Sequence, residues 1–118
     1  MRTRTLRFGL YADEQGLTWV RRLVEEAVAC RSARIVTETA GHTVFGSEMT
    51  AAYAYDFLVD QWAGEHPGQS SGSREPVELH VRLECSLKTW RAICKAVIRE
   101  LCPEGMEPHL CRVPWTVG

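Results

Sequence analysis

The most constraining feature of the sequence is a strict two-residue alternation over residues 77–86. Its apolar positions are Val77, Leu79, Val81, Leu83 and Cys85, and its polar positions are Glu78, His80, Arg82, Glu84 and Ser86. This period places alternate side chains on opposite faces of a β-strand. We therefore expect a strand with one face in a core and the other in water, as in antiparallel or mixed sheets.

Changes of period along the chain predict the other elements. Alternation predicts a strand at 6–11, and helical spacing from Leu17 predicts an amphipathic helix ending near Cys30. In chain order, the remaining expected elements are a hairpin of strands 35–39 and 42–45, a helix from Ser47 to His66 capped by Ser47, a helix capped by Ser86, and an edge strand within 108–117.

The order strand, helix, two strands, helix, loop, strand, helix, strand predicts an α+β fold. We expect a two-layer sandwich in which helices cover one face of a mixed, mostly antiparallel sheet. The pairs Thr18-Trp19 and Thr89-Trp90 hold similar places after strands, which reflects either two related strand-helix-strand halves or chance. Residues 1–118 are expected to form one domain, with a flexible loop at 67–76 (PGQSSGSREP).

Composition narrows the class of protein. The chain has 118 residues, of which 45% are hydrophobic and 25% charged, as in globular proteins, and its apolar runs are too short to span a membrane. We find no signal-peptide pattern, and the five cysteines form no CxxC pair. We therefore expect free buried thiols and a cytoplasmic location.

A metal site is one alternative use of the cysteines. Cys102, His109 and Cys111 lie close in sequence, and Cys94 or Cys85 would be the fourth zinc ligand. The spacing matches no familiar zinc motif, and Cys94 and Cys85 fall at core positions, so we expect no metal or cofactor. No nucleophile, phosphate-loop or dinucleotide motif is present, so we also expect no enzymatic activity.

The expected helix 47–66 concentrates acid and aromatic residues. It contains no Lys or Arg. Its helical projection assigns Ala51, Tyr55, Leu58, Val59 and Trp62 to the core. The projection leaves Tyr53, Asp56, Phe57 and Asp60 near solvent. Since aromatic rings are favoured at interfaces and carboxylates attract cations, these four residues form the predicted binding site for a protein with a basic surface, or for a second copy in a homodimer.

A basic helical face provides an alternative function. Lys88, Arg91, Lys95 and Arg99 follow one another at spacings of three, four and four residues and share one side of the third helix. Such a row could bind nucleic-acid phosphates, with Arg2, Arg4 and Arg7 nearby in the sequence. The acidic residues that follow and the pI of about 6.4 favour an ordinary solvated face.

The run Val20–Leu58 resembles a known unit. Its helix, Cys30, the hairpin with His42-Thr-Val-Phe-Gly46, and the stretch from Glu48 through Ala-Tyr-Ala-Tyr-Asp-Phe-Leu58 are similar to the C-terminal helix-hairpin-helix unit of an uncharacterised family of phage and bacterial proteins. That family also has a small N-terminal helical domain, and the strand and basic helix after residue 76 have no counterpart in it. The resemblance implies a phage protein that binds host machinery, of the type of anti-CRISPR inhibitors of host defence. It implies no catalytic residues.

Overall fold

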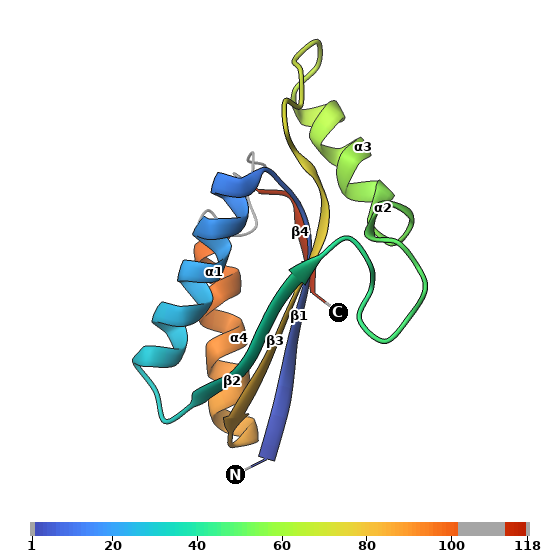
Figure 1. Ribbon diagram of the computed structural model, residues 1–118. Helices are drawn as coiled ribbons and strands as arrows, with labels where there is room; N and C mark the ends of the chain where they lie inside the picture. Colours follow the sequence, from blue (N-terminus) through green and yellow to red (C-terminus); the bar gives the residue numbers. More distant parts are fainter. Residues whose placement is uncertain (1, 102–112, 118) are drawn as a thin grey trace.

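The computed structural model describes residues 2–101 and 113–117 and shows a four-stranded sheet with helices on both faces (Figure 1). The elements in chain order are β1 (Arg2–Ala12), α1 (Glu14–Ala29), β2 (Arg34–Gly41), α2 (Ala51–Ala54), α3 (Asp56–Glu65), β3 (Glu75–Cys85), α4 (Leu87–Leu101) and β4 (Trp115–Val117). The sheet order is β2-β3-β1-β4, and all neighbouring strands are antiparallel. Apart from α2 and α3, this β-α-β-β-α-β arrangement is the split β-α-β, or ferredoxin-like, topology. The predicted α+β class is confirmed, although the described sheet is antiparallel throughout and not mixed. That the two strand-helix-strand halves are related stays a prediction.

The two central strands explain why the alternation is so strict. β1 and β3 pair along their whole length, from Arg2 opposite Cys85 to Ala12 opposite Glu75. The apolar set of β3 and the apolar residues of β1 form the main core on one face of the sheet. Helices α1 and α4 cover this face (Figure 1). The alternating pattern therefore results from burial of one side of β3 beneath two helices.

Both covering helices begin at side-chain caps. Asp13 Oδ1 accepts a hydrogen bond from Gly16 N at 2.7 Å, and Ser86 Oγ accepts one from Thr89 N at 3.1 Å. Each cap satisfies an amide that lacks a partner within the helix. The buried side chains recur at helical spacing and join the main core: Val20, Val24, Ala27 and Val28 in α1, and Ile93, Val97 and Leu101 in α4.

The expectation that all helices cover one face is corrected by α2 and α3, which lie on the other face near one end of the sheet (Figure 1). Ala51, Tyr55, Leu58 and Trp62 are buried there as the projection predicted, and Val59 is partly buried. They pack against Tyr11, whose ring centroid lies 6.3 Å from that of Trp62. Since Tyr11 follows Leu10 in β1, its side chain points away from the main core and gives this pair of helices a separate apolar surface.

The predicted hairpin is wrong. β2 is a single strand that ends at Gly41, and residues 42–50 form a loop with an isolated bridge between Thr43 and Thr50. Within the loop, the amide of Phe45 donates to a side chain of β3 and the amide of Val44 donates to Met49 O at 2.8 Å. These partners replace the hydrogen bonds that a second hairpin strand would have made.

The long helix expected from Ser47 is also corrected. Thr50 is the actual N-cap, because its side chain accepts from Tyr53 N at 3.2 Å. The helix is interrupted at Tyr55, whose backbone (φ −118°, ψ 25°) is not α-helical. Ser47 Oγ instead accepts from Met49 N at 3.0 Å within the loop.

The boundaries of the loop after α3 and of the last strand differ only slightly from those expected. The loop after α3 ends at Arg74, because Glu75 and Pro76 already belong to β3. Gly68 and Gly72 have positive φ angles in this loop, a conformation that favours glycine. β4 is an edge strand, as predicted, although residues 108–112 of the expected range lie outside the described residues.

Gly9 in β1 lies directly against the Tyr55 ring of the second helical layer. A Cβ at Gly9 would lie 2.3 Å from Tyr55 Cε1. We predict that Gly9→Ala lowers the free energy of unfolding by about 1–3 kcal/mol, because the Tyr55 ring must move. Gly41→Ala is the control, since a Cβ there meets no atom within 4 Å. Equal denaturant midpoints for the two variants would contradict this packing.

Candidate functional site

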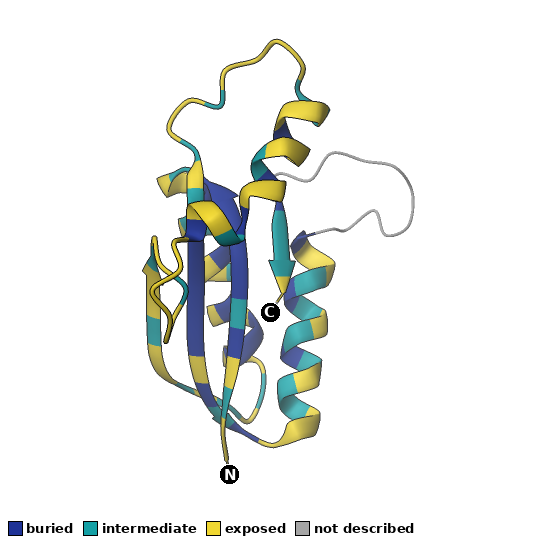
Figure 2. Cartoon of the chain, turned by 90° about the vertical axis from the view of Figure 1, so that its right-hand side faces the viewer, coloured by how far each residue is buried: buried dark blue, intermediate teal, exposed yellow. Residues whose placement is uncertain are grey.

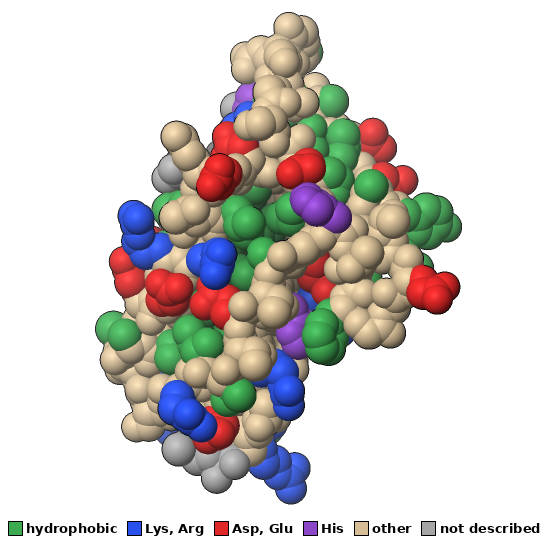
Figure 3. All heavy atoms as spheres, viewed as in Figure 1, with side chains coloured by type: hydrophobic (Ala, Val, Ile, Leu, Met, Phe, Trp, Pro, Cys, Tyr) green, Lys and Arg blue, Asp and Glu red, His purple; other side chains and the backbone are tan. Residues whose placement is uncertain are grey.

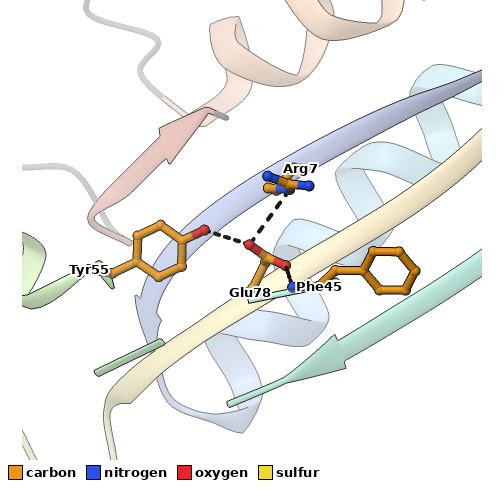
Figure 4. Close-up of polar contacts among 4 residues, drawn as sticks. All are labelled: Arg7, Phe45, Tyr55 and Glu78. Atoms are coloured by element: carbon orange, nitrogen blue, oxygen red, sulfur yellow. Dashed lines mark hydrogen bonds and ion pairs between the residues drawn. The ribbon is translucent and has the colours of Figure 1, made fainter. Parts of the chain in front are cut away.

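A buried carboxylate on β3 joins three separate segments of the chain. Glu78 is only 3% exposed. Its Oε1 accepts a hydrogen bond from the Tyr55 hydroxyl at 2.6 Å, and its Oε2 accepts one from Phe45 N at 2.7 Å (Figure 4). Arg7 Nε lies 3.7 Å from Oε1. Because a buried carboxylate is stable only when partnered, these contacts fix the loop 42–50 and the α2–α3 junction to the sheet.

The hydrogen-bonded Tyr55 is a permanent donor. Burial of its ring, and then its hydrogen bond to Glu78, raise the pKa of Tyr55 well above its usual value. The hydroxyl therefore keeps its proton at neutral pH. In this arrangement it donates its proton in the hydrogen bond to Glu78.

His80 lies beside this cluster and is covered by an aromatic ring. It is 5% exposed, and the Phe45 ring stacks on it with centroids 4.0 Å apart and an interplanar angle of 18°. Burial lowers the pKa of His80, and the charges of Arg7 and Arg82 lower it further. His80 is therefore a neutral imidazole beneath Phe45 at physiological pH.

Sequence reasoning placed Glu78 and His80 on the polar side of β3, which is correct, but it expected that side to be in water. The loop and Tyr55 bury both residues. The pairing of Tyr55 with Glu78 spans 23 positions, and no local pattern signals it. Two polar residues in an alternating strand look the same whether or not a distant loop covers them.

The four residues predicted to bind a partner are all exposed, and we refer to them as the acidic-aromatic surface. Tyr53 on α2 is 74% exposed and Phe57 on α3 is 49% exposed. Asp56 and Asp60 are exposed one helical turn apart on α3. Neither aspartate forms a salt bridge with any other residue in 2–101 or 113–117. Acidic and hydrophobic side chains lie next to one another at the right-hand edge of the view in Figure 3, where α2 and α3 are placed.

The predicted basic face is also exposed, on the opposite side of the sheet. Lys88, Arg91, Lys95 and Arg99 are exposed on α4. None of the salt bridges within the described ranges involves these four residues. The acidic-aromatic surface and the basic face are thus separated by the sheet and the main core (Figure 1).

The cysteines separate into three environments. Cys85 is buried and Cys94 half-buried, and burial raises the pKa of both thiols, so they stay protonated. Cys30 is exposed, contrary to the expectation of buried thiols, because it is the C-cap of α1. Cys102, His109 and Cys111 lie outside the described residues, and the part of the chain that is described holds no group of metal-ligating side chains.

Comparison with known proteins does not assign this chain to a family. No protein-family model, curated protein or solved structure matched this chain. The resemblance of residues 20–58 to a phage and bacterial family therefore stays a prediction. Within 2–101, none of the helices has the length and apolar character needed to cross a membrane.

The hydrogen bond from Tyr55 to Glu78 can be tested with a matched pair of variants. We predict that Tyr55→Phe lowers the free energy of unfolding by about 1–3 kcal/mol, because it leaves a buried carboxylate oxygen without its donor. Tyr53→Phe removes the same hydroxyl from an exposed ring and should leave stability unchanged. Chemical denaturation measures both, and a Tyr55→Phe variant as stable as the wild type would show that the bond contributes little.

Proposed function

We propose that this protein is a non-enzymatic binding module whose acidic-aromatic surface docks on a protein with a basic surface. The observation that carries the proposal is the exposure of Tyr53 and Phe57 beside two carboxylates that lack salt-bridge partners in the described chain. Large rings in water are unfavourable for a free monomer and are common in the centres of interfaces.

The fold presents this surface in a defined geometry. Tyr53 and Phe57 flank Tyr55, whose hydroxyl is bound to Glu78 in the sheet. Holding a binding surface in place before association reduces the entropy lost when the partner binds. Asp56 and Asp60 would increase the association rate with a basic partner and align it on the rings.

The specific partner we propose is a host complex that handles nucleic acid, with this protein acting as a phage inhibitor of host defence, as anti-CRISPR proteins do. Two considerations support this choice. Nucleic-acid-binding complexes have grooves rich in Lys and Arg, which carboxylates beside aromatic rings could occupy. The resemblance of residues 20–58 also implies a phage setting.

A second candidate function is direct nucleic-acid binding by the basic face of α4. The observation that favours it is the exposure of four cations without salt bridges in the described ranges, spread over about 16 Å of helix. Such a row could contact successive phosphates. It predicts binding that weakens steeply with salt.

Affinity capture from the native host tests the leading proposal. We predict that Asp56→Lys combined with Asp60→Lys weakens partner capture roughly tenfold or more, as does Tyr53→Ala combined with Phe57→Ala. The matched control is Glu25→Lys with Glu26→Lys, which makes the same charge change at exposed positions of α1. Capture that is equal in the wild type and the aspartate variant would remove the acidic-aromatic surface from consideration.

A further inference from the structure

The face of the sheet opposite α1 and α4 is only partly covered. Figure 2 looks onto this face and shows the half nearer the N-terminus free of helices. Strand pairing sets the order of side chains there. Thr5 and Thr37 lie on either side of Arg82, and Arg7 and Thr39 lie on either side of His80.

Arg82 is the free cation at the centre of this face. It is exposed and forms no salt bridge within 2–101 or 113–117. The carboxylates near it are already engaged, because Glu84 pairs with Arg34 at 2.6 Å and Glu78 accepts from Tyr55 and Phe45. A guanidinium between two threonine hydroxyls can donate several hydrogen bonds to one phosphate.

Phe45 forms an aromatic surface beside that cation. One side of its ring rests on His80, yet the residue remains 55% exposed, so the other side faces solvent. Its backbone bond to Glu78 holds it in this position. His80 and Arg82 are two residues apart on β3, or about 7 Å, so the exposed ring and the free guanidinium are neighbours on the same face.

We propose that this open sheet face binds single-stranded nucleic acid, with a base stacked on Phe45 and a backbone phosphate on Arg82, Thr5 and Thr37. Arg7 is partly exposed beside His80 at the edge of this site, but its charge is paired with Glu78. Stacking on Phe45 requires an unpaired base, so single strands should bind better than duplexes. The phosphodiester is common to DNA and RNA, so both should bind. This site is separate from the acidic-aromatic surface and from the basic face of α4.

Fluorescence anisotropy of the full chain with labelled oligothymidylate and oligouridylate at low salt tests the proposal. A duplex of equal length serves as comparison. Arg82→Gln should weaken binding of both single strands roughly tenfold and reduce the slope of log affinity against log salt by about 0.7, the value for one phosphate contact. Phe45→Leu keeps an apolar cover on His80 but removes the ring, and it should weaken binding roughly fivefold or more.

The control is Arg22→Gln, which removes one exposed positive charge from α1 and should leave single-strand binding unchanged. Lys95→Gln tests the basic face of α4 separately. Circular dichroism and thermal melting establish that each variant is folded. The proposal is overturned if the wild type binds neither probe at low salt, or if Arg82→Gln binds as the wild type does. Loss of binding in Lys95→Gln alone would also overturn it and would assign nucleic acid to α4.

Discussion

The buried carboxylate of Glu78 holds in place the segments that cover the second face of the sheet, the face opposite α1 and α4. It lies on a central strand, and it accepts hydrogen bonds from Tyr55 after α2 and from Phe45 in the preceding loop. Removing a carboxylate from water costs several kcal/mol, which two hydrogen bonds and the nearby Arg7 offset. The loop and the paired short helices therefore hold a fixed position on the sheet, although the core beneath them is small.

This arrangement creates the two surfaces that we propose as binding sites. The main sandwich of α1, α4 and the sheet has its own large core, and α2 and α3 are an addition between β2 and β3. The addition covers one end of the second face and leaves the other end open, and Phe45 lies beside the open part. The outer side of the addition has the acidic-aromatic surface, and the open part has Arg82 with its neighbouring threonines. The contacts of Glu78 hold Tyr55 beneath the first surface and Phe45 beside the second.

The sequence predicts the main sandwich well because its elements have regular periods. Alternation at 77–86 and the apolar stripes of α1 and α4 directly reflect burial against one core. The run 42–45 has the composition of a strand but is a loop, since its amides bond to Glu78 and Met49 instead of to a neighbouring strand. Composition cannot show which acceptor an amide will find.

The candidate sites also differ in how much of each can be predicted from the sequence. The exposure of Tyr53 and Phe57 could be predicted, because a helical projection separates them from Tyr55 and Trp62. The burial of Glu78 and His80, and the threonines beside Arg82, depend on strand register and on contacts between distant segments. Only the three-dimensional structure provides these.

Hydrogen exchange of the native protein, compared between the wild type and Glu78→Gln, tests the central role of Glu78 most directly. We predict that amide protection over residues 44–62 falls roughly tenfold or more, while the amides of α1 and α4 keep theirs. Tyr55 and Phe45 donate to different oxygens of Glu78, and glutamine replaces one of those oxygens with an NH2 group. Unchanged protection over 44–62, or an equal loss throughout the protein, would contradict this role of Glu78.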